Sequence, residues 1–348
     1  MILLIAVIVL AFIFDYINGF HDAANSIATV VTTRVLTPVQ AVIWAAFFNF
    51  VAFFIAKYWY GSFGIADTVS KVVTEGSVTL TVILAGLIAA ITWNLITWRF
   101  GIPSSSSHTL IGGLAGAAIV HGGLTAINIK VISIIIAFIF VAPFVGMVAG
   151  MAVTIISLHL SRGVKPRHAE PLFKRLQLFS SAWLSINHGL NDSQKVMGVI
   201  GIALIYYNMQ AGADAAALPD WVRLTSMEDI HDWVPFTCFT AIALGTMSGG
   251  WKIMKTMGNK ITKLNAFEGF CTQMASSITL YFTEHYHIPV STTHTITGAI
   301  MGVGSVKRLS AVRWGVTVDL IWAWIVTIPI SALLAAIVYW ILGAFGLS

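Results

Sequence analysis

Long apolar segments, separated by short polar stretches, follow one another along the whole chain. The first runs from Ile2 to about Val31, although about 20 apolar residues are enough to cross a bilayer. Polar and charged residues interrupt it at Asp15, Asn18-Gly19 and His21-Asp22, so we predict a helix that is broken near Gly19. Further apolar segments of the first half lie at 38–57, 78–98, 110–120 and 131–160, with a more polar loop at 58–77.

The second half of the chain repeats this order. An apolar segment at 179–207, interrupted at Asn187-His188-Gly189 and Asn191-Asp192, is followed by an acidic loop at 208–232 and by apolar segments at 233–250, 265–283 and 310–346. A basic stretch from Arg162 to Arg175 separates the two sets. We therefore predict an all-α membrane protein with roughly 10–12 membrane helical segments. Its predicted parts are an N-terminal repeat at 1–160, a cytoplasmic basic linker at 161–178 and a C-terminal repeat at 179–348.

A hydroxyl-rich motif occurs once in each half. The copies read Ile102-Pro103-Ser104-Ser105-Ser106-Ser107-His108-Thr109 and Ile288-Pro289-Val290-Ser291-Thr292-Thr293-His294-Thr295. Proline ends one helix, and serine or threonine caps the next. The free N–H groups and positive dipole end of such a helix start suit an oxyanion. We therefore take Ser105, Ser106, Ser107, Ser291, Thr292 and Thr293 as candidate substrate ligands, with the first hydroxyls of each run favoured. Helix capping and bonds between helices are the alternative.

Composition and charge placement agree with a membrane transporter. The chain is 57% hydrophobic and only 9% charged, whereas a soluble domain carries about 25% charged residues. If each hydroxyl motif is the tip of a re-entrant hairpin and the linker is cytoplasmic, most Lys and Arg face the cytoplasm. Both termini then lie outside, and the halves are inverted repeats with broken helices, as in secondary transporters. The net charge of +5 is therefore an orientation signal in a multi-pass inner (plasma) membrane protein, with no nucleic-acid partner.

A second pair of motifs carries ionisable groups inside apolar segments. Asn18-Gly19-Phe20-His21-Asp22-Ala23-Ala24-Asn25 aligns with His188-Gly189-Leu190-Asn191-Asp192-Ser193-Gln194-Lys195. Intramembrane carboxylates are expensive unless they are paired or functional. We predict that Asp22 and Asp192 bind the driving cation, with Asn25, Asn191 and His21 beside them. A structural polar network that holds the two interrupted helices together is the alternative.

Several other polar residues in apolar segments leave more than one interpretation open. Lys195 could pair with Asp192 or attract the anion, and we place it with Gln194 among the candidate substrate ligands. Arg99 could pair with Glu284. His108 and His294 are either satisfied core histidines or proton carriers. Asp15 and Asp319 are expected to form structural pairs, and Cys238 and Cys271 to be buried thiols, with no resident metal or cofactor.

On these residues the sequence resembles the inorganic phosphate transporter (PiT) family. The two copies at 18–25 and 188–195 look like its duplicated signature, and Trp93-Asn94 through Thr109 and Pro289 to His294 look like its two hairpin signatures. The resemblance implies a phosphate symporter with inverted repeats, two re-entrant hairpins and a homodimeric assembly. His21 stands where sodium-coupled members usually carry Asn. At this position the sequence is most similar to the bacterial low-affinity phosphate permeases. These permeases are described as coupled to protons and as carrying phosphate together with a divalent metal.

The function expected from the sequence is import of inorganic phosphate, alone or as a metal–phosphate complex, in symport with a cation, with H+ favoured over Na+. A sulfate or other oxyanion permease is the alternative within transporters, and a passive channel is another. An intramembrane hydrolase that uses Ser106 or Ser107 with His108 is a remote alternative, because neighbouring residues on a helix diverge.

Overall fold

The computed structural model describes residues 1–61 and 63–347, and these residues form helices and turns but no strand. The helices of the first half are α1 (Ile2–Thr32), α2 (Pro38–Ile55), α3 (Gly64–Ser70), α4 (Leu80–Phe100), α5 (Ser106–Gly122) and α6 (Ile129–Leu160). Those of the second half are α7 (Pro166–Ala211), α8 (Trp233–Ser248), α9 (Trp251–Asn259), α10 (Ala266–His285), α11 (Thr292–Lys307) and α12 (Trp314–Ala344). The predicted all-α membrane class is confirmed.

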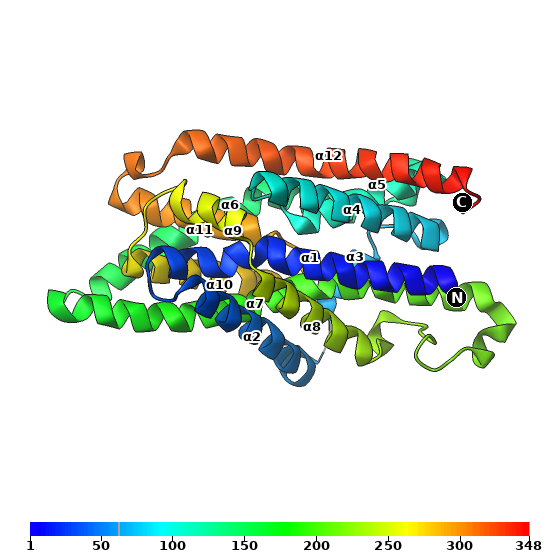
Figure 1. The fold of residues 1–348 in the computed structure, drawn as a ribbon, viewed down its shortest axis with the longest axis horizontal. Helices are drawn as coiled ribbons and strands as arrows, with labels where there is room; N and C mark the ends of the chain where they lie inside the picture. The colour runs from blue at the N-terminus through cyan, green and yellow to red at the C-terminus, as the bar shows by residue number, and fades with distance from the viewer. Residues whose placement is uncertain (62, 348) are drawn as a thin grey trace.

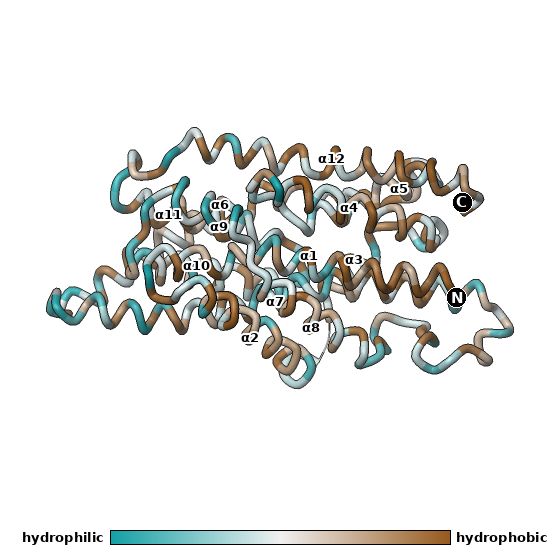
Figure 2. Tube along the Cα trace, viewed as in Figure 1, coloured by the Kyte–Doolittle hydropathy of each residue, from teal (hydrophilic) through white to brown (hydrophobic). Residues whose placement is uncertain are grey.

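The helices lie roughly along one long axis, with both chain ends at the same end of the molecule (Figure 1). The turn between α6 and α7 lies at the opposite end (Figure 1). Within the described residues, six helices are long and apolar enough to cross a membrane. Hydrophilic residues gather in the connections at the two ends of the bundle (Figure 2). This arrangement fits a multi-pass protein whose termini share one side of the bilayer.

The breaks that we predicted in the first and seventh helices are absent. The helix α1 continues through Gly19, and α7 continues through residues 187–192. A Cβ atom at Gly19 would clash with the carbonyl oxygen of Ile242 on α8, and one at Gly189 would lie 2.7 Å from the carbonyl oxygen of Asn49 on α2. These glycines therefore permit close helix packing, and helix termination was the wrong interpretation of them.

The connection between the two halves is also more regular than the sequence suggested. Only residues 161–165 are non-helical there, because α7 already begins at Pro166, a residue type that suits a first helical turn. In the same way, α3 occupies part of the predicted loop at 58–77. Both differences add helix to segments whose polar composition had indicated loops.

Each hydroxyl motif is the turn of a helical hairpin, α4–α5 in the first half and α10–α11 in the second. Gly101 ends α4 with a positive φ of 66°, which glycine adopts without strain. The first hairpin packs on α12, where a Cβ at Gly116 would clash with the carbonyl oxygen of Ala332. The second hairpin packs on α6, where a Cβ at Gly302 would clash with the carbonyl oxygen of Met147. Each hairpin is thus held by the last long helix of the other half.

Candidate functional site

The two hydroxyl motifs approach the same segment of α1 in the interior of the protein. The Ser106 hydroxyl at the start of α5 donates to Asp22 Oδ2 at 2.7 Å. At the start of α11, the hydroxyl oxygens of Thr292 and Thr293 accept hydrogen bonds from Asn25 Nδ2, at 3.1 and 3.0 Å. All of these side chains are buried. Residues 18–25 of α1 therefore link the turns of both hairpins.

One hydroxyl of each run caps the helix that follows it. Ser105 Oγ accepts from the backbone N–H of His108 at 3.2 Å, and Ser291 Oγ accepts from that of His294 at 3.3 Å. Capping needs one hydroxyl per helix start. It explains Ser105 and Ser291, which we had favoured as ligands, but it leaves Ser106, Ser107, Thr292 and Thr293 without a capping role. These four are the hydroxyls that contact the ionisable residues.

The Ser106 hydroxyl lies between two acceptors. Its oxygen is 2.5 Å from Asn18 Oδ1 and 2.7 Å from Asp22 Oδ2. A hydroxyl group has one hydrogen to donate, so an ionised Asp22 and the amide oxygen compete for it. If Asp22 is protonated, its O–H donates to Ser106, which donates in turn to Asn18. A proton on Asp22 and a turned amide of Asn18, which would then donate to Ser106, are two ways to satisfy this arrangement.

The amide of Asn25 connects the two aspartates through threonine hydroxyls. Thr292 Oγ1, which accepts from Asn25, donates to Asp192 Oδ2 at 3.4 Å, and Thr293 Oγ1 donates to Asp22 Oδ1 at 3.5 Å. These last two contacts are at the long end of hydrogen-bonding range. Asn25 Oδ1 is buried without a partner among the described residues, so the amide retains an unused acceptor in a polar interior.

The ammonium group of Lys195 has three partners. Lys195 Nζ lies 2.6 Å from Ser107 Oγ, 2.6 Å from Asp192 Oδ1 and 2.7 Å from the carbonyl oxygen of Val290. An ammonium group has three hydrogens to donate, and all three are used here. The predicted pairing with Asp192 is thus present, and it holds the positive charge beside the first hydroxyl motif.

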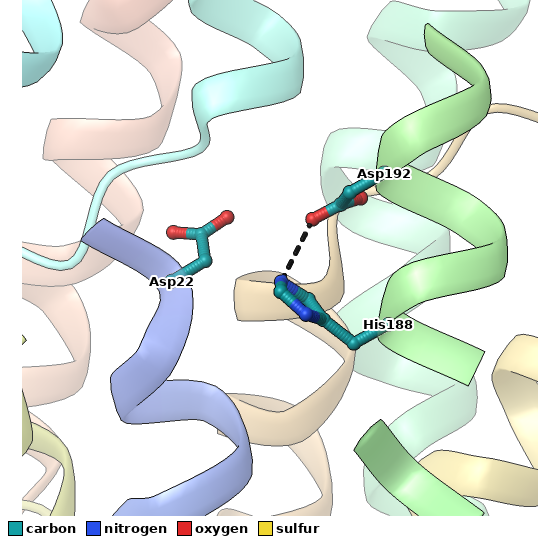
Figure 3. A group of neighbouring side chains, drawn as sticks. All are labelled: Asp22, His188 and Asp192. Atoms are coloured by element: carbon teal, nitrogen blue, oxygen red, sulfur yellow. Dashed lines mark ion pairs between the residues drawn. The ribbon is translucent and has the colours of Figure 1, made fainter. Parts of the chain in front are cut away.

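Two carboxylates and an imidazole form a cluster on facing helices. Asp22 on α1 lies across from Asp192 and His188 on α7 (Figure 3). One ligand atom from each lies within 4.8 Å of the others, and all three residues are buried. His188 Nε2 is 3.1 Å from Asp192 Oδ2, and neither amide atom of the neighbouring Asn191 has a partner in the described part of the chain. Oxygen and imidazole donors in this number could hold a cation.

His188 was not among our candidate site residues. We had interpreted Asn187-His188-Gly189 as a helix interruption and had included His188 in the duplicated motif at 188–195, without assigning it a role. The signal that would have found it is its spacing, because His188 and Asp192 are four residues apart and lie on one face of a helix. His188 Nδ1 also contacts Asn49 Oδ1 on α2 at 3.2 Å, which orients the ring.

His21 and Gln194 face different surroundings. His21 Nδ1 lies 2.8 Å from Asp22 Oδ1, and its Nε2 lies 3.1 Å from Thr97 Oγ1 on α4, so the ring adjoins the carboxylate cluster. The Gln194 amide faces away from it. Gln194 donates to Glu284 Oε1 at 2.6 Å and accepts from the backbone N–H of Ile65 at 3.1 Å. Glu284 is thus bound by Gln194, and the predicted pairing with Arg99 is wrong because that side chain is exposed.

The histidines of the hydroxyl motifs face each other. The ring centroids of His108 and His294 are 4.8 Å apart, and His294 stacks on Trp324 at 4.1 Å. Both rings are buried, and none of their four nitrogens has a hydrogen-bond partner among the described residues. The interpretation of satisfied core histidines that bond a neighbouring loop is therefore wrong.

This interior combines groups for an anion with groups for a cation. Hydroxyl donors and an ammonium suit a tetrahedral oxyanion, while two carboxylates, amide oxygens and an imidazole suit a cation. Because Ser106, Thr292 and Thr293 contact the carboxylates directly, the two kinds of group are not separate sites. What occupies one set must change the hydrogen bonds of the other.

Comparisons with known proteins show to which family the chain belongs. The model of the phosphate transporter family matches residues 18–165 and 156–335. A probable low-affinity inorganic phosphate transporter of Rhizobium meliloti is 45% identical over 97% of this chain and 96% of its own. One of Bacillus subtilis is 42% identical over 98% of both chains. A solved structure, described as the sodium-dependent phosphate transporter, covers 99% of this chain and 100% of its own with a TM-score of 0.81 and 26% identity. With the family motifs on both hairpins and on α1 and α7, the chain belongs to the phosphate transporter family.

Proposed function

We propose that this phosphate transporter imports inorganic phosphate in symport with a cation, and that the cation is H+ in preference to Na+. The observation that carries the proposal is the sharing of hydroxyl groups between the two functions. Ser106 binds Asp22, and Thr292 contacts Asp192, so hydroxyls that suit phosphate are held by carboxylates that suit a cation.

Charge on the two aspartates sets the direction of this coupling. While Asp22 and Asp192 are ionised, they attract the hydroxyl hydrogens and the ammonium of Lys195. A cation that neutralises the carboxylates weakens their attraction for these donors, so that phosphate oxygens can compete for them. The bound anion then favours the cation-loaded state by the same free energy, because coupling between two sites is reciprocal.

The preference for H+ rests on the hydrogen-bond arrangement around Asp22. A proton on this carboxyl satisfies both Ser106 and Asn18, as described above, and the imidazole of His21 adjoins the other carboxylate oxygen at 2.8 Å. Sodium is the competing cation. It is favoured by the structural relative, which is described as sodium-dependent and is 26% identical to this chain.

The proposed phosphate ligands are the hydroxyls of Ser106, Ser107, Thr292 and Thr293, together with Lys195 and the helix starts capped by Ser105 and Ser291. The proposed cation ligands are Asp22, Asp192, Asn25 and Asn191, with His188 added and His21 beside them. Gln194 is left out because its amide already binds Glu284 and Ile65. A metal–phosphate complex would use the same carboxylate cluster.

Phosphate is preferred over sulfate on physical grounds. Monohydrogen phosphate has a hydroxyl to donate, whereas sulfate can only accept hydrogen bonds. Asp22 and Asp192, which contact the hydroxyl motifs, offer acceptors for that hydrogen. The relatives are transporters, and within the described residues the ring of His108 contacts no hydroxyl group, so the chain is not a hydrolase that uses Ser106 or Ser107.

Radiolabelled phosphate uptake into proteoliposomes tests the proposal, with proton and sodium gradients imposed separately. We expect saturable uptake that follows an inward proton gradient. A tenfold excess of sulfate should compete little, which means that the binding free energies of phosphate and sulfate differ by more than about 1.4 kcal/mol. Uptake driven by a sodium gradient alone would show that Na+ is the coupling cation. Uptake that depends on neither gradient would show that the protein is a passive pathway. Light scattering of the purified protein tests the homodimer that we propose.

A further inference from the structure

Asp15 is a buried carboxyl group that the proposed function does not use. It lies on α1 with 0% of its surface exposed. Within the described residues, neither of its oxygens has a hydrogen-bond partner. No basic side chain among those residues forms an ion pair with its carboxyl group. The structural pair that we expected from the sequence is absent. A group of this kind points to a function, because intramembrane carboxylates without a structural partner are typically functional.

Asp15 shares one face of α1 with the residues of the central site. Asp15, Asn18, Asp22 and Asn25 are spaced by three, four and three residues, which is the spacing of a single helix face. Seven residues of helix separate Asp15 from Asp22, a rise of about 10 Å. Between them, Asn18 Oδ1 accepts from the Ser106 hydroxyl, which also contacts Asp22. A line of polar groups thus connects Asp15 with the cation cluster.

The surroundings of Asp15 contain no group of opposite charge that is free to pair with it. Phe14 and Cys238 belong to the buried apolar cluster around it. The ionisable groups close enough to act on its charge are Asp192 and Lys195 on α7 and the Cys238 thiol on α8. Asp192 repels a negative charge. Lys195 cannot pair with it, because its three hydrogens are bound to Ser107, Asp192 and Val290. Asn18 lies one turn further along α1, close enough to interact with the carboxyl group, but within the described residues neither carboxyl oxygen has a hydrogen bond of ordinary geometry.

We propose that Asp15 is a proton-binding carboxyl group that loads the coupling proton on the N-terminal side of the anion site and delivers it to Asp22. This inference rests on the proposed proton symport. The carboxylate of Asp15 takes a proton from water when the N-terminal end of the bundle opens. It then gives that proton, through water between the helices, to the carboxylate of Asp22, so that Asp15 is ionised again as Asp22 becomes neutral. Phosphate itself does not reach Asp15.

The side chain of Asp15 suits this role better than a structural one. A carboxyl group that served only to join helices would be hydrogen-bonded, as Asp192 is to Lys195. A group that gains and loses a proton in each transport cycle cannot keep a permanent cationic partner, since a fixed cation would hold it ionised. With the N-terminus outside, as the charge distribution predicts, Asp15 lies between the external water and Asp22.

Reconstituted Asp15→Asn tests the inference, because asparagine has nearly the same shape but cannot bind a proton. Two assays are compared, namely phosphate counterflow without a gradient and phosphate accumulation under an inward proton gradient. We expect counterflow to remain within about twofold of the wild type while accumulation falls about tenfold or more. Asp15→Glu, which keeps the carboxyl group, is expected to retain both. Asp319→Asn, which changes an exposed carboxylate on α12, is the matched control and should behave as wild type.

An independent readout is the infrared band of protonated carboxyl groups at neutral pH, which we expect to be smaller in Asp15→Asn than in the wild type by the contribution of one carboxyl group. Proton-driven accumulation by Asp15→Asn at the wild-type level would overturn the inference, as would an unchanged infrared band. Loss of counterflow together with accumulation would also overturn it, since Asp15 would then belong to the anion site or the folding core. Failure of the wild type itself to follow a proton gradient would instead refute the proposed proton symport, and the inference with it.

Discussion

The ammonium of Lys195 lies 2.6 Å from the hydroxyl of Ser107, in a contact that joins two elements 88 residues apart in the chain. It places a positive charge from α7 at the start of α5, where the helix dipole is also positive. Both features attract an anion, and the carboxylate of Asp192 balances them while no anion is bound. The site therefore holds its own counter-charge, which a bound anion would have to displace.

Removing the Ser107 hydroxyl should weaken phosphate binding without unfolding the protein. In Ser107→Ala, Lys195 keeps Asp192 and the Val290 carbonyl oxygen, so one hydrogen bond to a charged group is lost, worth about 2 kcal/mol. We expect a rise in KM for phosphate of about tenfold or more, and a moderately lower Tm because the buried ammonium loses one of its three acceptors. Ser248→Ala, near the end of α8 and away from the hairpins, is the control. An unchanged KM would exclude Ser107 from the proposed phosphate ligands.

Removing the positive charge should affect stability as well as transport. Lys195→Met leaves the buried carboxylate of Asp192 without its ammonium partner, which costs about 3 kcal/mol or more. We expect a lower Tm and no phosphate uptake. The double variant Lys195→Met with Asp192→Asn removes both charges and should recover much of the Tm but none of the uptake. Equal losses of Tm in the single and double variants would contradict the pairing.

Substitution of His188 should change the cation dependence more than the phosphate dependence. The ring adjoins Asp192 and is oriented by Asn49. We expect His188→Ala to raise the cation concentration needed for half-maximal uptake by about tenfold, as for other groups that orient cation ligands, while KM for phosphate at saturating cation stays near the wild-type value. His231→Ala, in a loop between α7 and α8, is the matched control. If the phosphate KM changes and the cation dependence does not, His188 belongs to the anion ligands.

The glycines at the hairpin contacts should tolerate no side chain. Gly116→Val would drive a branched side chain into the backbone of α12 at Ala332, and overpacking of this kind costs about 2 kcal/mol. We expect a clearly lower Tm by fluorescence scanning. Gly76→Val is the control, because a Cβ there meets nothing within 4 Å. Equal melting of both variants would show that the hairpin does not need this close contact.

The direction of insertion can be measured with single cysteines. Gly163→Cys, in the turn between α6 and α7, should react with an impermeant maleimide only from the cytoplasmic side, and a cysteine near Met1 only from outside. The native Cys238 and Cys271 are buried and should add little background. Labelling of both positions from the same side would contradict the predicted topology, since they lie at opposite ends of the molecule (Figure 1).

The duplicated motifs were enough to predict the class of fold and the groups that meet in its centre. Spacing and chemistry identified Asp22, Asn25 and Asp192, because a carboxylate or amide inside an apolar segment is costly unless it is paired or functional. The sequence did not predict which groups bind each other. Glu284 pairs with Gln194 and not with Arg99, since side-chain direction depends on helix rotation that no local pattern sets.

The predicted helix breaks failed for a related reason. Gly19 and Gly189 sit beside polar residues, and this combination is found both at unwound segments and at close helix contacts. Only the facing backbone of Ile242 or Asn49 distinguishes the two cases. Asp15 was misjudged in the same way, because its lack of a partner depends on Lys195 being occupied elsewhere.

The exchange of hairpins between the two halves has a consequence for how the chain is made. The glycine-rich face of α5 packs on α12, which follows it in the chain only after six further α-helices. Until α12 leaves the ribosome and enters the bilayer, this face of α5 contacts lipid or a temporary neighbour. The first hairpin therefore reaches its final packing only after α12 has been inserted, and a chain truncated before Trp314 would leave the glycine-rich face of α5 without its partner.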